Sequence, residues 1–205
     1  MESSSRRRRL RIRMSFSEIR RFFIDENVKS VARRLFVTNA VDSLLAYAGA
    51  IVGNYASGNT NPYSYIATGI GLALSISLLS NFLAVFFVEE AERRVELVFV
   101  SKHMLRDLNN SVLGKAPRIV ALYVAMWSAI GAFSFPSLAS LAFIPALLSL
   151  ASIHACVIAS LAIVVGIMFG LGMYLGRLIG RGASGWGARF ALIGVIPLLL
   201  SLVMR

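Results

Sequence analysis

Long apolar runs, separated by short polar segments, dominate this amino-acid sequence. Asp, Glu, Lys and Arg are absent from residues 35–88 except at Asp42, from residues 119–176, and from residues 190–204. A membrane-spanning helix needs about 20 mostly apolar residues, so each of the first two runs has room for two helices and the last has room for one. The pattern predicts an all-α integral membrane protein with five transmembrane helices.

Breaker residues indicate where these helices end. The stretch ASGNTNP at residues 56–62 predicts the turn between the first two spans. The next turn within the membrane-spanning part is expected in FSFPSLASLAFIP, between or near Pro136 and Pro145, although either proline can instead kink a helix. The fifth span is expected from about Trp186 to Met204. A hydrophobic fraction of 57% and a mean hydropathy of +0.73 agree with this layout.

The positive charges give the layout an orientation. Of the 21 Lys and Arg residues, 11 precede residue 35, six lie in residues 93–118 and three in residues 177–189. Five spans put these groups on one side, which the positive-inside rule identifies as cytoplasmic. We expect a protein of the cell membrane with its N-terminus in the cytoplasm and its C-terminus outside or in a lumen. We interpret the net charge of +11 as attraction to anionic lipid headgroups rather than to nucleic acid.

Charge and hydropathy divide the chain into four parts. These are a basic tail with an amphipathic helix (1–34), spans one and two (35–88), an acidic cytoplasmic helical segment (89–116), and spans three to five (117–205). The capping pattern SFSE, from Ser15 to Glu18, predicts where the amphipathic helix begins. Because no Gly or Pro occurs from Leu72 to Leu113, the second span is expected to continue as one helix into the cytoplasm.

The first span carries a stripe of polar and small residues on one helical face. The stripe consists of Asn39, Asp42, Ala46, Gly49 and Gly53, spaced 3, 4, 3 and 4 apart. Small residues at this spacing let another helix approach closely, and we expect a second copy of the chain there. The opposite face, which includes Leu44 and Ile51, is expected to contact lipid. A carboxylate inside a span is costly and indicates a functional site, unless Asp42 reaches back to Arg34 at the interface.

The second span repeats the pattern of small residues. Its stripe consists of Gly69, Ala73, Ser77, Ser80 and Ala84, flanked by Asn81. We therefore expect the first two spans to pack tightly against each other.

Acidic residues recur along the predicted cytoplasmic extension of the second span. Five residues lie broadly on one side of this helix, namely Glu89, Glu92, Glu96, His103 and Asp107. Carboxylates with one imidazole suit Mn²⁺ or Fe²⁺, which accept oxygen and nitrogen ligands. The alternative, which the spacing itself favours, is a solvated helix face with Glu–Arg pairs, because Arg93, Arg94, Lys102 and Arg106 are interleaved.

Taken in order, these segments resemble the vacuolar iron transporter family. The resemblance rests on DSLLAYAGAIVG in the first span, on a second span rich in Gly, Ala and Ser that runs into VEEAERRVEL, and on three further spans. It implies a homodimer of five-span chains that exports Fe²⁺ or Mn²⁺ from the cytoplasm in exchange for protons, between the two first helices. The metal is the transported ion, and no permanently bound cofactor is implied.

The same resemblance assigns roles to particular residues. Asp42 matches the transport aspartate of the family, whereas Glu89 or Glu90, Glu92 and Glu96 match its metal-collecting cytoplasmic helix. The chain departs from the family in the second span, where Ser77 and Asn81 replace a methionine and a glutamate.

A lone acid within the membrane can hold a cation or a proton but not both, which is the minimum requirement for exchange. On this hypothesis Asn39, Asn81 and Ser77 supply neutral oxygens beside Asp42. One alternative is a membrane scaffold or degenerate relative that transports nothing. Another is an intramembrane enzyme that uses the polar residues of the fourth span, Ser152, His154, Cys156 and Ser160. No nucleophile or metal-ligand motif accompanies them, so we do not expect an enzyme.

Overall fold

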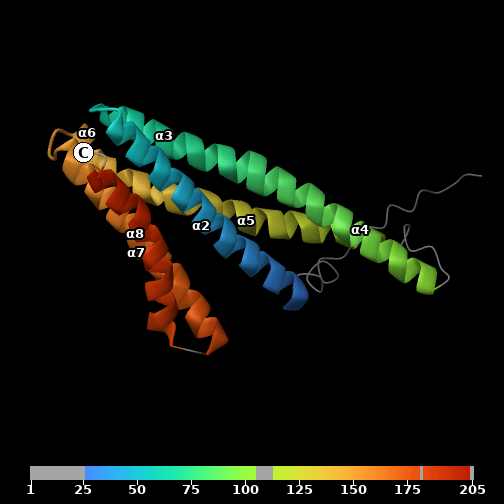
Figure 1. Cartoon of the computed structure of the whole chain (residues 1–205). Coiled ribbons are helices and arrows are strands. Elements are labelled where there is room, and N and C mark those ends of the chain that lie inside the picture. The colour runs from blue at the N-terminus through green and yellow to red at the C-terminus, as the bar shows by residue number, and fades with distance from the viewer. Residues whose placement is uncertain (1–25, 105–112, 181, 204–205) are drawn as a thin grey trace, which may run out of the picture.

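The computed structural model describes residues 26–104, 113–180 and 182–203, and no strand occurs among them (Figure 1). Within these ranges five helical segments are long and apolar enough to cross a membrane, which confirms the expected number. The longer helices are α2 (Glu26–Ala56), α3 (Pro62–Leu74), α4 (Val85–His103), α5 (Ala116–Ser140), α7 (Ile153–Ile179) and α8 (Ala183–Val203). The shorter ones are a π-helix, η1 (Ser75–Ala84), two 3₁₀ turns, η2 (Leu113–Lys115) and η3 (Leu141–Phe143), and α6 (Ile144–Leu147). The amphipathic helix predicted to begin at Ser15 lies outside the described residues.

The turn between α2 and α3 lies where the breaker residues predict it. Gly58 has a φ of 74°, a left-handed conformation that glycine adopts at little cost. Asn61 then caps α3, since its side-chain oxygen accepts a hydrogen bond from the Tyr63 amide at 3.0 Å. Pro62 occupies the first turn of α3, where its missing N–H removes no helical hydrogen bond.

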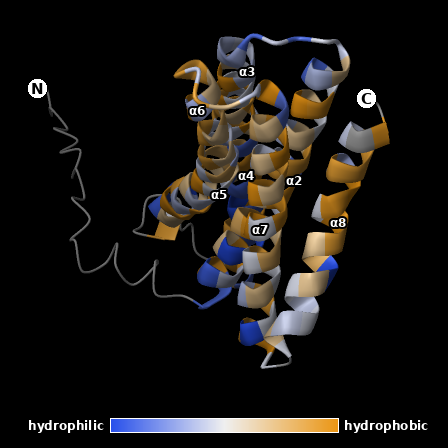
Figure 2. Cartoon of the chain, turned by 90° about the vertical axis from the view of Figure 1, so that its left-hand side faces the viewer, coloured by the Kyte–Doolittle hydropathy of each residue, from blue (hydrophilic) through white to orange (hydrophobic). Residues whose placement is uncertain are grey.

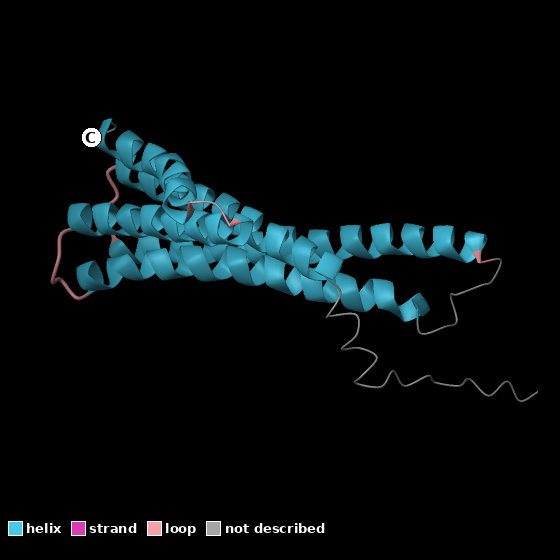
Figure 3. Ribbon diagram, turned by 90° about the horizontal axis from the view of Figure 1, so that it is seen from below, coloured by secondary structure: helices cyan, strands magenta, loops and turns pink. Residues whose placement is uncertain are grey.

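The segments α3, η1 and α4 form one continuous helix of 42 residues, from Pro62 to His103, as the absence of Gly and Pro predicts. At about 1.5 Å per residue it is roughly 63 Å long, about twice the thickness of a hydrocarbon core. Figure 3 shows the far end of this helix projecting beyond the other long helices. The charge-free part of this helix ends at Val88, and the residues from Glu89 onward carry its acidic and basic side chains.

The predicted turn near Pro136 and Pro145 is placed wrongly. Pro136 lies inside α5, and η3 and α6 continue the helical path past Pro145. The chain reverses only at residues 148–152, where Ser149 has a φ of 59° and Ser152 caps α7 by accepting a hydrogen bond from the Ala155 amide. Between the two prolines the chain forms the 3₁₀ turn η3, whose hydrogen bonds replace those of a regular α-helix, so neither proline ends the span.

A core of α2, α5 and α7 holds the bundle together, with α8 paired to α7 (Figure 1). Gly172 and Gly176 bring these last two helices close, since a Cβ at Gly172 would lie 2.5 Å from the Trp186 carbonyl oxygen. The face of α2 that was expected to contact lipid is instead part of this core, because Leu44 and Ile51 are fully buried. Lipid and protein interior are equally apolar, so hydropathy does not separate the two faces.

Candidate functional site

Asp42 is exposed on the surface of α2 and opens into a cavity of about 420 Å³. Arg33, Arg34 and Thr38 line the polar end of this cavity, and apolar side chains of α7 and α8, including Leu175 and Phe190, line the rest. The carboxylate therefore lies on the same side of α2 as two guanidinium groups, close to the end at which the helix begins. A cation that reached it would share the cavity with two fixed positive charges.

The small residues that follow Asp42 are also exposed. Ala46, Gly49 and Gly53 face away from the core, and a Cβ built on either glycine would meet no atom within 4 Å. The other side of the same stretch, with Tyr47 and Ile51, is packed in the core. Packing against a second copy of the chain stays a prediction, and the face it requires is open.

Asn39 belongs to a different contact from Asp42. Its side chain is half-buried, and its amide nitrogen donates a hydrogen bond to the hydroxyl of Ser128, which is fully buried on α5. Asn39 thus ties α2 to α5 inside the chain, and it does not line the cavity of Asp42. Its side-chain oxygen is the atom still suited to a cation.

The buried stripe of the second span differs from the predicted one. Every buried residue of α3, η1 and α4 falls on a spacing of four or a multiple of four, namely Tyr65, Gly69, Ala73, Ser77, Asn81 and Glu89. Ser80 and Ala84, which were assigned to the stripe, are exposed. In an α-helix a spacing of four drifts by about 40° per step. The π-helix has more than four residues per turn and reverses the drift, which keeps the stripe on one face.

Ser77 and Asn81 therefore do not lie beside Asp42. Both are buried on η1, which packs against α5, and neither lines the Asp42 cavity. The side-chain nitrogen of Asn81 is buried and has no hydrogen-bond partner among the described residues. The expected tight contact between the first two spans is present at Gly69, where a Cβ would lie 2.8 Å from the ring of Tyr47 and equally close to the Ser140 Cβ.

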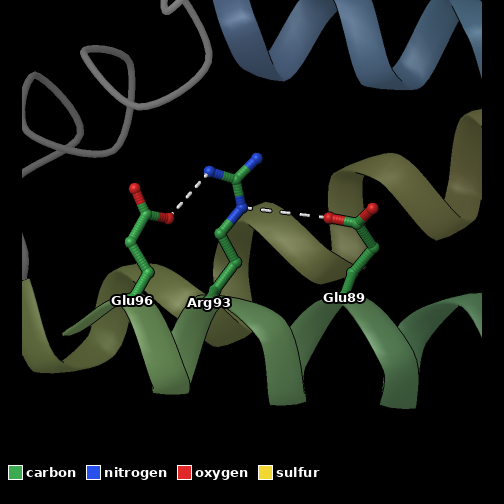
Figure 4. Close-up of polar contacts among 3 residues, drawn as sticks. All are labelled: Glu89, Arg93 and Glu96. Atoms are coloured by element: carbon green, nitrogen blue, oxygen red, sulfur yellow. Dashed lines mark hydrogen bonds and ion pairs between the residues drawn. The ribbon is translucent and has the colours of Figure 1, made fainter. Parts of the chain in front are cut away.

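The acidic extension contains the Glu–Arg pairs of the alternative interpretation. In Figure 4, Arg93 lies between Glu89 and Glu96, with nitrogen–oxygen distances of 3.8 and 3.4 Å. Glu90 pairs with Arg94 at 2.6 Å. Glu92 is exposed, and the exposed His103 contacts the carbonyl oxygen of Phe99 through Nδ1 at 2.9 Å.

Glu89 is the one buried carboxylate on this described part of α4, with 8% of its surface exposed. Burial raises the pKa of Glu89 above its ordinary value. The guanidinium of Arg93 opposes that shift, the carboxylate of Glu92 adds to it, and Arg34 of α2 opposes it. Arg34 and Glu89 line a common cavity of about 270 Å³ between α2 and α4.

No cluster of three or more His, Cys, Asp or Glu side chains suited to a metal ion occurs among the described residues. Glu89, Glu92, Glu96 and His103 are all described, whereas Asp107 lies outside the described residues. The predicted metal ligands of the extension are therefore not gathered into such a cluster within the described chain.

The polar residues of the fourth span each make a contact that fits a packing role. Ser152 caps α7, and His154 Nδ1 lies 2.6 Å from the Tyr55 hydroxyl. Ser160 lies 2.7 Å from the Tyr47 hydroxyl and donates to the Ala139 carbonyl oxygen at 3.0 Å, which links α2, α7 and α5. Cys156 is buried.

Two residues with defined positions went unnoticed in the sequence. Arg33 borders two cavities, and its Nε is buried without a hydrogen-bond partner among the described residues. Ser128 is the partner of Asn39. The sequence holds only a weak indication of the position of Arg33, because it lies one helical turn before Val37, which is buried. The chain matches no protein-family model, no curated protein and no solved structure.

Proposed function

We propose that two copies of this chain form a membrane transporter that exchanges a divalent cation, Mn²⁺ or Fe²⁺, for protons. The observation that carries the proposal is the position of Asp42, a carboxylate within an apolar helix that is exposed beside a cavity and on the same face as the open Gly49 and Gly53. Charged side chains in a membrane span are rare and serve ion pathways more often than packing.

A second copy supplies what one chain lacks. The described residues of one chain bring no cluster of acids or histidines together, so a cation site in the membrane requires two Asp42 carboxylates. Close approach of the two stripes would bring them together, because Gly49 and Gly53 leave room for another backbone. Asn39, although one turn away, contacts Ser128 of α5 and does not line this cavity, so the site is proposed without it.

The exchange follows from competition at the carboxylates. A divalent cation between two carboxylates excludes protons from them, and protonation removes the negative charge that holds the cation. Arg33 and Arg34, in the same cavity, balance the carboxylates when neither ligand is bound and slow the approach of cations. The two Asp42 carboxylates are therefore the only titratable groups that this exchange of metal for protons requires.

The competing proposal is a membrane scaffold that transports nothing. It is favoured by the same two arginines, because a carboxylate whose charge is balanced by guanidinium groups in its own cavity needs no ion. The burial of Ser77 and Asn81 against α5, away from Asp42, also fits it. The two proposals differ in whether purified protein moves metal.

The test is entry of Mn²⁺ into proteoliposomes with a pH dye inside. We expect the wild type to move Mn²⁺ with an opposing proton flux, and Asp42→Asn to lose at least about 90% of both, because the amide keeps the shape and removes the charge. Glu26→Gln is the matched control, since it removes an exposed acid from the same helix. It should leave the flux unchanged. Coupled flux from Asp42→Asn would contradict the role of Asp42, and no flux from the wild type would favour the scaffold.

A further inference from the structure

A second cavity lies on another side of α2, separate from Asp42. Its volume is about 400 Å³, and helices α2, α5 and α7 enclose it. The α2 residues Lys29, Arg33 and Phe36 line one wall, and aromatic side chains line the others. It lies at the end of the bundle where α2 begins, where hydrophilic residues occur (Figure 2) and where Lys29, Arg33 and Arg34 follow one another along α2.

Arg33 lines this cavity, and one of its hydrogen-bond donors is unsatisfied within the described chain. Its Nε is buried and has no hydrogen-bond partner among the described residues. A buried donor on a charged group is costly when unpaired. The other cation, Lys29, lies 3.2 Å from Glu26, but that carboxylate is 78% exposed and the pair is weak. Two cations therefore border one cavity whose lining contains no carboxylate, since Glu26 is exposed outside it and Asp42 opens into the neighbouring cavity that Arg33 also borders.

The aromatic walls suit a membrane interface. Trp127 makes edge contacts with Phe36 and Tyr123, with ring centroids 5.9 and 6.3 Å apart. Tyr174 faces them from α7. Trp and Tyr gather at the level of lipid headgroups, where an apolar ring meets a polar surface. The cavity thus combines basic groups with apolar walls at one depth.

We propose that this cavity binds one anionic phospholipid of the cytoplasmic leaflet. The lipid phosphate accepts hydrogen bonds from Arg33 and from Lys29, and the upper part of an acyl chain lies against Phe36 and Trp127. A planar guanidinium matches a phosphate group better than an ammonium does, and basic pockets between membrane helices on the cytoplasmic side suit such headgroups. The proposal does not depend on metal transport.

The test is native mass spectrometry of the full-length protein in detergent, titrated with phosphatidylglycerol or phosphatidylcholine. We expect the wild type to retain one phosphatidylglycerol per chain with about tenfold preference over phosphatidylcholine. Arg33→Gln should lower the affinity for phosphatidylglycerol about tenfold. Arg34→Gln is the matched control, since it removes the same charge from the neighbouring position, which does not line this cavity. Its affinity should stay within about twofold of the wild type.

Equal losses in Arg33→Gln and Arg34→Gln would overturn the proposal, because they indicate attraction to surface charge alone. Displacement of the lipid by millimolar inorganic phosphate would overturn it too, since the site would then take a free anion. If Arg33→Gln does not fold, photo-crosslinking of the wild type tests the same proposal. A photoactivatable phosphatidylglycerol should label peptides that contain Phe36, Trp127 or Tyr174. Labelling concentrated on the exposed Leu78 and Leu79 of η1 instead would contradict the site.

Discussion

Two glutamates of α4 show how position alone separates residues of one type. Glu89 and Glu96 each pair with Arg93, at 3.8 and 3.4 Å. The side chain of Glu89 is 10% exposed and that of Glu96 is 65% exposed. Exposed ion pairs contribute little to stability, whereas burial penalises the charged form of a carboxylate. The burial of Glu89 therefore ties the stability of the fold to pH.

Glu89 should make the protein less stable as the pH rises. Its pKa in the folded chain is raised by burial, so the unfolded chain ionises first. Its contribution is present below the unfolded pKa and is lost as the pH rises through the folded pKa. In detergent, the melting temperature of Glu89→Gln should rise progressively above that of the wild type between about pH 4 and pH 7. The difference should be roughly 2–4 °C for each kcal/mol of stability that the wild type loses as Glu89 ionises.

Glu96→Gln provides the comparison for this measurement. It removes the other carboxylate that contacts Arg93 but exposes no buried group, so its melting temperature should follow the wild type across the same pH range. If the gap between Glu89→Gln and the wild type narrowed as the pH rose, the assigned direction of the pKa shift would be wrong.

At the scale of helices, the glycines separate contacts within the chain from contacts that are still open. Gly69 is closely packed, since a Cβ there would meet Ser140 and Tyr47 at 2.8 Å. Gly49 and Gly53 meet nothing within 4 Å. A small-residue stripe in the sequence looks the same in both cases, because hydropathy and spacing do not tell which helix approaches.

Replacing Gly49 and Gly53 together by leucine should weaken association of two copies and leave each chain folded. The added side chains would project where a second α2 is predicted to pack, so the apparent dissociation constant should rise by at least about tenfold. The measurement is the monomer–dimer equilibrium in detergent or lipid by fluorescence energy transfer. Gly71→Leu is the control, since Gly71 is also open but lies on α3. Unchanged association in the double variant would place the interface elsewhere.

Much of the helical layout was predictable because it depends on charge and breaker residues. The number of spans, the turn at residues 56–62 and the continuous helix through Glu89 all follow from where charges, Gly and Pro fall. The turn at residues 148–152 was missed, since two prolines drew attention to the wrong stretch and a serine forms the positive-φ turn.

The faces of the helices were harder to predict than their ends. In the π-helix η1, Asn81 lies on the buried stripe and Ser80 does not, contrary to the α-helical spacing assumed for this span. No local sequence pattern predicts a π-helix. Of the candidate site, the exposure of Asp42 agrees with an open face on α2. The grouping of Asn81 and Ser77 with Asp42 does not appear within the described chain, because α5 lies against η1.

At the scale of the whole molecule, charge is concentrated at one end. Figure 2 shows hydrophilic residues near both ends of the bundle and largely apolar helices between them, but the charged ones among the described residues lie toward the end where α2 begins and α4 extends. The described charged residues at this end include Lys29, Arg33, Arg34, Arg177 and Arg189. The opposite end carries the two turns at residues 57–61 and 148–152, which contain no Asp, Glu, Lys or Arg.

This asymmetry predicts the orientation in the membrane. Basic segments stay on the cytoplasmic side, so Lys102 and Ser184 should lie inside while Thr60 and Ser149 lie outside. All four are exposed, and each can carry a single cysteine once the buried Cys156 is replaced by alanine. A membrane-impermeant thiol reagent should label Thr60→Cys and Ser149→Cys in intact cells.

Lys102→Cys and Ser184→Cys should label only after the membrane is made permeable, since five spans and a cytoplasmic N-terminus put both beyond the barrier. Each outcome tests a different part of the prediction. Reversal of all four would show that the basic end faces outward, against the positive-inside rule. Labelling of Thr60→Cys and Ser149→Cys from opposite sides would show that one of the helices between them does not cross the membrane. Reversal would also change which end of α2 meets the cytoplasm, and with it the side from which a cation reaches the cavity of Asp42.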